Sequence, residues 1–382
     1  MATIERVTRK PKGGREQASY RVRYRDPEHH QKSRTFKRKD EATRFATAVG
    51  HTIATGAYVD PRKGKITVAE YAPIWLRTKG KLRASSRARL EGVVTTHIIP
   101  AFGHRRLDQV SHEEVSEWVS DLQTRRSEAT ARKALIALRQ LYREAISARR
   151  IPFDPTEKVE LPVEHAEQQR FLTVAEVSTL ADAIEPRFRA LVFLAAYGGL
   201  RYGELAGLRR KRIDLLRGRV EVAEAMIDVH GSAISYGPPK SERSLRTVPL
   251  PRRVVQELEH HLAEYVAPDA DSLVFTGPKG APIRRTGFRR LWWAPATRAA
   301  GLEGLKVHEL RHTFVALSVA AGCDARKVSI WAGHSTVAFT LDRYGGLYRD
   351  DEAADMSRLD ALLDTARPLE IAQVTSMKGQ FR

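Results

Sequence analysis

The chain has 382 residues, 42% of them hydrophobic, which is enough apolar material to fill the cores of two or three domains. Its formal net charge of +19 favours a polyanionic partner, most often nucleic acid, with a merely arginine-rich surface as the alternative. The single cysteine, Cys323, excludes an intrachain disulfide and a metal cage of several cysteines, and it fits a reducing, intracellular location. No apolar run approaches the roughly 18 residues that span a bilayer, and the N-terminus lacks the apolar core of a secretory signal, so neither a membrane protein nor an exported one is expected.

Residues 1–64 are predicted to form a small basic module. They hold 16 Lys and Arg against 7 Asp and Glu, so +9 of the chain's +19 charge lies in about one sixth of its length. Strands are expected over 4–9, 20–24 and 33–37, followed by a helix from Asp40 that covers the apolar face of the sheet. In the middle strand cations alternate with larger side chains, which predicts a basic face for DNA phosphates, although charges that merely prevent edge aggregation are the alternative. The candidate DNA-binding residues here are Arg21, Arg23, Arg25, Lys37 and Arg38.

Residues 65–163 are predicted to form four helices without a strand. Apolar residues recur at helical spacing from Val68 and again after Ser111, where Ser111 and Glu114 form a capping box. The second helix is expected to end near Thr96, before the break at Ile99-Pro100. Taken alone, the pattern supports only a basic helical bundle that could lie on a phosphate backbone. Its candidate DNA contacts are Arg87 and Lys133.

Residues 164–382 are predicted to form a third module. In it, polar residues come directly after segments that are predicted to be buried. A nearly continuous apolar run, 188–196, is long enough for a buried helix, and two glycines then end it and present Arg201 at a turn. An arginine at such a turn is commonly the structural partner of a carboxylate, and Glu204 is the candidate.

A predicted pair of strands over 220–229 and 244–250 would place Lys240 at or near a hairpin tip. A loop lysine is most often simply solvated, so a functional role for Lys240 needs support from other residues of the chain. A basic helix start before Trp292 and Trp293 would suit backbone phosphates. The candidate DNA contacts in this module are Arg243, Arg285 and Arg289.

The pentapeptide from His308 to His312 matches His-Glu-x-x-His, the zinc-protease signature in which two histidines one turn apart bind the metal. A zinc protease needs a third protein ligand, and residues 314–320 supply neither His nor Glu. Arg311 would also place a permanent positive charge in the same turn as the dication. Chance occurrence is the better account, and no metal is expected.

Five short motifs, which carry six polar residues in order, make the chain resemble the tyrosine recombinase, or phage integrase, family. They are Gly-Leu-Arg-x-Gly-Glu around Arg201, a lysine before Ser-x-Arg-Thr-Val-Pro-Leu at Lys240, His-x-x-Arg at His308 and Arg311, Gly-His at His334, and Leu-Asp-Arg-Tyr-Gly at Tyr344. Each motif is weak alone, but their order is specific. Two departures remove no catalytic group: Glu309 stands where aspartate is more usual, and Gly346 where a histidine is common.

The resemblance implies a mainly α, multidomain fold with small β-sheets. Residues 1–64 would be an arm-type DNA-binding domain, a three-stranded sheet plus a helix. Residues 65–163 would be a helical, SAM-like core-binding domain of four helices, and residues 164–382 a mixed α+β catalytic domain. The whole resembles integrases of the larger, arm-binding, three-domain type.

The chemistry of the family fits these residue types. Tyr344 would be the nucleophile, because a protein nucleophile conserves the energy of the DNA phosphodiester as a covalent 3′-phosphotyrosine ester. Arg201 and Arg311 would bind the non-bridging oxygens, since a guanidinium offers parallel donors to a phosphate. His334 would donate a further hydrogen bond to the same phosphate.

Proton transfer completes the expected site. His308 is the expected acceptor of the tyrosine proton, and Lys240 the expected acid that protonates the departing 5′-oxygen. The resemblance further implies that Glu204 orients Arg201 or His308. No external cofactor is needed.

The expected function is site-specific recombination of double-stranded DNA at attachment sites, for integration or excision of a phage or mobile element. The resemblance implies a homo-tetramer on DNA, accessory bending or directionality proteins, and a location in the bacterial cytoplasm at the nucleoid. An apolar stripe within 350–365 predicts a helix that docks on a neighbouring protomer. A type IB topoisomerase and a non-enzymatic DNA-binding protein are the alternatives, and the attachment-site sequence cannot be read from the chain.

Overall fold

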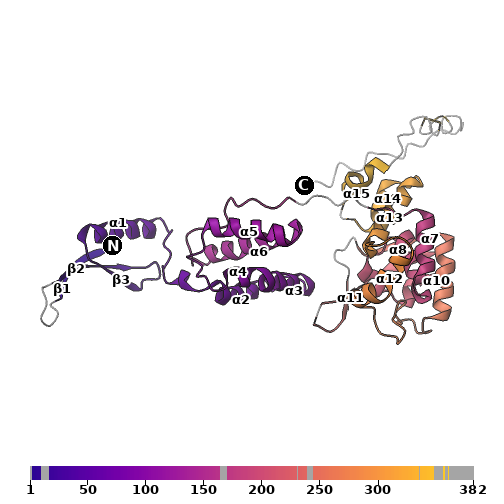
Figure 1. Cartoon of the computed structure of the whole chain (residues 1–382), viewed down its shortest axis with the longest axis horizontal. Coiled ribbons are helices and arrows are strands. Elements are labelled where there is room, and N and C mark those ends of the chain that lie inside the picture. Colours follow the sequence, from indigo (N-terminus) through magenta and orange to yellow (C-terminus); the bar gives the residue numbers. More distant parts are fainter. Residues whose placement is uncertain are drawn as a thin grey trace, which may run out of the picture. The chain divides into compact units, whose positions relative to one another are not determined.

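The computed structural model describes residues 2–9, 17–163, 170–229, 231–238, 244–334, 336–347, 356–357 and 360 (Figure 1). The chain divides into two compact units, residues 1–167 and 168–382. Both are built mainly of helices with small antiparallel sheets, so the predicted fold class is confirmed. The finer boundary predicted between residues 64 and 65 stays a prediction, although the segments on either side have separate hydrophobic cores.

The N-terminal segment folds as predicted, into a three-stranded antiparallel sheet with one helix packed on it. Val22 and Tyr24 on the middle strand are buried against Ala42 and Val49 of the helix. Alternation along a strand therefore turns the intervening arginines to the opposite face. The elements are β1 (Thr3–Arg9), β2 (Gln17–Arg25), β3 (Gln31–Phe36) and α1 (Lys39–Ala54).

The face of this sheet away from α1 is mainly polar, and arginines outnumber acidic residues on it. Arg23 and Arg25 are exposed and Arg21 is half-buried. The cross-strand neighbours of Arg23 are Thr3 and Ser33, so small hydroxyl side chains surround it. Its ion pair with Glu5, at 3.1 Å, is exposed on both sides and contributes little to stability.

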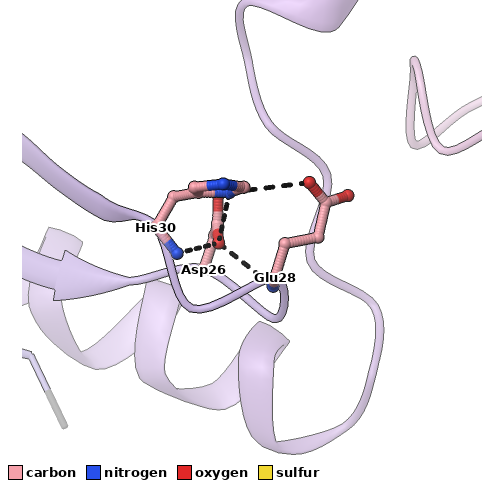
Figure 2. A group of neighbouring side chains, drawn as sticks. All are labelled: Asp26, Glu28 and His30. Atoms are coloured by element: carbon pink, nitrogen blue, oxygen red, sulfur yellow. Dashed lines mark hydrogen bonds and ion pairs between the residues drawn. The ribbon is translucent and has the colours of Figure 1, made fainter.

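The turn between β2 and β3 is stabilised by Asp26 (Figure 2). Its Oδ1 accepts the backbone N–H groups of Glu28 at 3.1 Å and His30 at 2.8 Å, and its Oδ2 lies 3.5 Å from Lys32 Nζ. Asp26, Glu28 and His30 are spaced like metal ligands, but Asx-turn hydrogen bonds already account for the aspartate.

The second segment is a helical bundle around Trp75, Leu138 and Tyr142. The capping box at Ser111 and Glu114 is confirmed. The elements are α2 (Val68–Thr78), α3 (Ala84–Val93), η2 (Val94–Ile98), α4 (Ile99–Phe102), α5 (His112–Arg125) and α6 (Glu128–Ser147), with the short turn η1 (Lys63–Lys65) before them.

The expected break near Thr96 is wrong, because the second helix continues to Phe102 through a π-helical turn. Ile99 N–H bonds to the carbonyl of Val94, five residues back, and Pro100 follows. Proline has no N–H and its ring clashes with the carbonyl four residues earlier in an α-helix. The wider π turn absorbs that clash without ending the helix.

The second unit surrounds the buried helix α8 (Arg189–Gly198), which packs on α13 (Val307–Ala320). The other helices are α7 (Val174–Ala183), α9 (Tyr202–Ala206), α10 (Arg252–Glu264), α11 (Arg285–Phe288), α12 (Ala294–Ala299), α14 (Ala325–Ala332) and α15 (Val337–Tyr344), with the π turn η6 (Arg289–Trp293) and the short turns η3 (Pro186–Phe188), η4 (Arg210–Arg212) and η7 (Gly345–Leu347).

The strands of this unit differ from the predicted pair. The expected strand over 220–229 is two strands, β5 and β6, that belong to different sheets, β4-β5-β8 and β6-β7. The predicted pairing of the two runs is confirmed in part, because β5 and β8 pair antiparallel, whereas the later part of the first run forms a hairpin of its own, β6-β7. The place of Lys240 at or near a hairpin tip stays a prediction. Lys240 and Arg243 themselves lie outside the described residues. The strands are β4 (Ile213–Asp214), β5 (Arg219–Val222), β6 (Ala225–Ile227), β7 (Ser235–Gly237) and β8 (Arg246–Pro249).

Beyond residue 347 only 356, 357 and 360 are described, so the predicted docking helix over 350–365 stays a prediction. Within the described part of the chain, no helix has the length and apolarity to cross a membrane.

Candidate active site

Five elements of the second unit bring their polar side chains together. The α8–α9 turn carries Arg201 and Glu204, and α13 carries Arg311 with a histidine on either side along the helix. The loop after α14 supplies His334, and Tyr344 ends α15. The strand β8 adds an arginine that the sequence analysis did not select.

Arg201 is held at a turn that only glycine can make. Gly199 ends α8 in the left-handed region at φ +66°, and a Cβ there would lie 2.3 Å from a ring carbon of Phe314. Arg201 Nη1 donates to Glu204 Oε1 at 2.8 Å, and Nη2 donates to the carbonyl of Gly333 at 2.7 Å. The arginine therefore links the α8–α9 turn to the end of α14, and its half-exposed guanidinium keeps further N–H groups for a ligand.

Arg311 reaches the same turn from α13 and is only 3% exposed. Its Nη1 donates to the carbonyl of Gly199 at 2.7 Å. Burial, with the charges of Arg201 and Arg246, lowers the pKa of Arg311 to about 9. Because a guanidinium keeps its proton in proteins, this shift indicates a site that is short of negative charge.

Arg246 on β8 is the arginine that the sequence analysis missed. Its Nη2 and Nη1 donate to the two carboxylate oxygens of Glu204 at 2.8 and 3.2 Å, and its Nε donates to the carbonyl of Trp331 at 2.7 Å. Gly333, at φ +64°, lies so close that a Cβ would be 3.1 Å from Arg246 Nη1. The sequence pattern that could have identified Arg246 was strand alternation, which places it on the same buried face as Val248.

Glu204 is the acidic centre of this cluster. Burial alone would raise its pKa, but hydrogen bonds and charges from Arg246 and Arg201 lower it instead, so the carboxylate stays ionised. The resemblance left open whether Glu204 contacts Arg201 or His308, and its hydrogen bonds go to Arg201 and Arg246. Three guanidinium groups against one carboxylate leave an excess of two positive charges, which suits a phosphodiester.

The histidines of the site are neutral near pH 7. Burial and the nearby arginines lower the pKa of His334 to about 3 and that of His308 to about 4. For His312, burial and its neighbour His308 lower the pKa to about 4. His334 Nδ1 shares a hydrogen bond with Thr340 Oγ1 at 2.8 Å, so with the hydroxyl as donor its Nε2–H is left for a ligand.

Tyr344 is 1% exposed and lies among these groups. Its ring is nearly parallel to that of His334, with centroids 6.4 Å apart, and its centroid lies 5.9 Å from that of Phe171. Its hydroxyl is hydrogen bonded to Nδ1 of His312. Burial raises the pKa of Tyr344, while the charges of Arg343 and Arg311 oppose that rise.

Most residues predicted for the site come together in the structure, but the contact of the tyrosine differs from the expectation. His308 was expected to accept its proton, and the hydroxyl instead contacts His312, a residue that was not selected. The sequence feature that could have pointed to His312 was the pentapeptide His308 to His312, which places it one helical turn after His308. That pentapeptide was interpreted as a chance match to a zinc motif.

The predicted DNA contacts of this unit border the site in part. Arg285, the first residue of α11, and Arg289, the first residue of η6, are both exposed, and the Arg285 guanidinium lies 5.6 Å from the centre of the Tyr202 ring. The charge of Arg285 also contributes to the lowered pKa of His308.

The other predicted contacts belong to the first unit. Lys133 and Arg38 are exposed, whereas Arg87 is half-buried and pairs with Glu91 at 2.9 Å. Lys37 is exposed directly after β3.

Known proteins match both helical parts of the chain. Residues 170–349 match the phage integrase family, and residues 67–123 match the phage integrase N-terminal SAM-like domain. A prophage phiRv2 integrase of Mycobacterium tuberculosis is 28% identical over 76% of this chain and 78% of its own length. The integrase of Mycobacterium phage D29 is 23% identical over 91% of this chain and 94% of its own length.

Solved structures share the fold. The Tn1549 transposon integrase, in complex with a circular intermediate DNA, matches with a TM-score of 0.65 at 19% identity, over 77% of this chain and 99% of that one. A lambda integrase tetramer bound to a Holliday junction matches with a TM-score of 0.56 at 15% identity, over 86% of this chain and 92% of that one. The chain belongs to the phage integrase family, whose members are tyrosine recombinases.

Proposed function

We propose that the chain is an integrase: a site-specific DNA recombinase that cleaves and rejoins DNA through a 3′-phosphotyrosine intermediate to integrate or excise a phage or mobile element. The observation that carries this proposal is the placement of a buried tyrosine among three guanidinium groups and three neutral histidines. Such a site combines an excess of positive charge with a nucleophile, as the cleavage of a phosphodiester through a covalent ester requires.

Binding of the scissile phosphate falls to Arg201 and Arg311. Each uses one nitrogen for a glycine carbonyl, of Gly333 and Gly199 respectively, which fixes the guanidinium plane and leaves other N–H groups for the non-bridging oxygens. His334 adds a donor to the same phosphate, in the tautomer set by Thr340. These groups stabilise the charge that develops on the phosphate oxygens in the transition state.

Strand cleavage follows when Oη of Tyr344 attacks phosphorus and the bond from phosphorus to the 5′-oxygen breaks. Lys240 is the proposed acid for the 5′-oxygen. The phenolic proton leaves towards the two histidines of α13, of which His308 is the acceptor that the family resemblance implies. Religation reverses these steps with a different 5′-hydroxyl, which exchanges strands.

The remaining partners are proposed from composition and relatives. The polar face of the N-terminal sheet, with Arg21, Arg23 and Arg25, fits phosphates of an arm-type site, and the helical module fits the core site. A homo-tetramer on DNA is supported by the lambda integrase tetramer bound to a Holliday junction. Action at the nucleoid in the bacterial cytoplasm, with accessory bending or directionality proteins, completes the proposal.

Covalent trapping tests the proposal. Sequencing the DNA trapped on the protein defines the attachment site. A duplex of that sequence, nicked so that cleavage releases a short fragment bearing the new 5′-hydroxyl, then accumulates the covalent adduct. We expect Tyr344→Phe to bind this duplex with unchanged affinity and to form no adduct. Adduct formation by Tyr344→Phe would reject the assignment.

The same assays separate the alternatives. Relaxation of supercoiled plasmids of any sequence, without recombination, would favour a type IB topoisomerase. Sequence-specific binding without any adduct from the unaltered chain would favour a non-enzymatic DNA-binding protein.

A further inference from the structure

The hydroxyl of Tyr344 has one hydrogen-bond partner among the described residues, Nδ1 of His312. His312 is half-buried on α13, and the ring centroids of His312 and Tyr344 lie 6.1 Å apart. This contact joins residues 32 positions apart, so it depends on how α15 packs against α13.

We propose that His312 is a further catalytic residue: its Nδ1 holds the phenol of Tyr344 and receives the phenolic proton as the oxygen bonds to phosphorus. The inference rests on the proposed function, since it requires Tyr344 to be the nucleophile. It assigns the first proton transfer to His312 in place of His308.

The geometry separates the two histidines of α13. They lie one turn apart, and their rings meet edge to face with centroids 4.9 Å apart and planes at 81°. His308 is the more exposed member of the pair, and neither of its ring nitrogens has a hydrogen-bond partner within the part of the chain that the structure describes. His308 therefore packs against His312 and supports its ring, while His312 contacts the reacting oxygen.

The surroundings of His312 suit a proton acceptor that works only with DNA bound. The groups that face it are His308 and Arg311 from α13, His334 from the loop after α14, and Arg343 and Tyr344 from α15. Burial and the cations among them lower its pKa to about 4, which leaves the imidazole neutral, with one ring nitrogen able to accept a proton. A bound phosphodiester brings negative charge into this cationic site and raises the proton affinity of His312 at the moment of attack.

The proton balance of the step is complete. The O–H bond of Tyr344 breaks, the bond from its oxygen to phosphorus forms, and the bond from phosphorus to the 5′-oxygen breaks. His312 becomes an imidazolium, and the 5′-oxygen takes a proton from the proposed acid, Lys240. In religation the imidazolium returns its proton to the phenolate that leaves phosphorus.

The test compares His312→Asn with the unaltered chain on the nicked attachment-site duplex. Asparagine places a hydrogen-bonding atom near the position of Nδ1 but cannot take up a proton. At pH 7 we expect cleavage to slow by about 100-fold, within the range typical of general acid–base catalysis. The loss should shrink as pH rises, because hydroxide then removes the phenolic proton, and DNA affinity should not change.

A second substrate distinguishes the two sides of the reaction. When sulfur replaces the bridging 5′-oxygen, the leaving thiolate needs no proton from an acid. The cleavage rate of a variant that lacks the general acid is therefore restored on this substrate. We expect His312→Asn to stay slow on this substrate, because its defect lies at the nucleophile. His260→Asn, the same substitution at an exposed histidine of α10, serves as the matched control.

Several outcomes would overturn the inference while leaving the proposed function intact. They are cleavage by His312→Asn within about threefold of the unaltered chain, recovery on the sulfur substrate, and a pH-dependent defect in His308→Asn alone. Should His312→Asn fail to fold, His312→Gln replaces it with the same expectations, and a loss in both that is independent of pH also counts against the inference. Failure of the unaltered chain to form any adduct would instead reject the proposed function.

Discussion

Replacing Glu204 with glutamine should destabilise the second unit strongly, because the buried Glu204 balances the buried Arg246 and the half-exposed Arg201. The side chains of Glu204 and Arg246 are each only 2% exposed and share two hydrogen bonds of 2.8 and 3.2 Å. Removing the charge from one partner of a buried pair leaves the other uncompensated, which typically costs about 3–5 kcal/mol. Glutamine keeps the shape and part of the hydrogen bonding, so we expect about 3 kcal/mol.

Thermal unfolding of the full chain measures this effect. For a unit of this size about 3 kcal/mol corresponds to a Tm lowered by roughly 6–12 °C. Glu221→Gln is the matched control, since Glu221 pairs with Arg212 at 2.7 Å but is 50% exposed, and its loss should cost under about 1 kcal/mol. Inorganic phosphate should stabilise Glu204→Gln more than the unaltered chain, because the positive excess of the site rises from two charges to three. Equal Tm values for the two variants would refute the account of Glu204 as a buried charge partner.

Other consequences can be measured on the same chain. The three neutral histidines of the site have pKa values below their unfolded value of about 6.5, so their contribution to stability is present above that pH and is lost as pH falls towards about 4. Urea denaturation over this range should show the loss, and an unfolding free energy independent of pH would contradict it. Gly199→Ala should destabilise the unit by more than about 1 kcal/mol through its positive φ and the clash with Phe314, whereas Ala at the open, ordinary-φ Gly287 should not. Arg23→Ala should reduce the slope of log affinity against log salt for arm-site DNA by about one, and Arg44→Ala, on α1, should leave it unchanged; equal slopes for both would reject the sheet face as the contact surface.

Local patterns were reliable wherever the deciding interactions are local. Strand alternation predicted that Val22 and Tyr24 face the helix, and the capping box at Ser111 begins a helix as expected. Local patterns gave the wrong element where the end of a helix or the pairing of a strand depended on a neighbouring turn or sheet. Pro100 was expected to end a helix and is instead absorbed by a π turn, and one apolar run at 220–229 divides between two sheets.

The sequence by itself determined the modules, the excess of positive charge and the order of the polar motifs that identify the family. These depend on residue type and spacing, which need no knowledge of packing. Only the tertiary structure decided that Arg246 shares Glu204 with Arg201 and that Tyr344 contacts His312. Both contacts join residues more than 30 positions apart in the chain. Two histidines one helical turn apart are equivalent in sequence, and the docking of α15 on α13 determines which one meets the tyrosine oxygen.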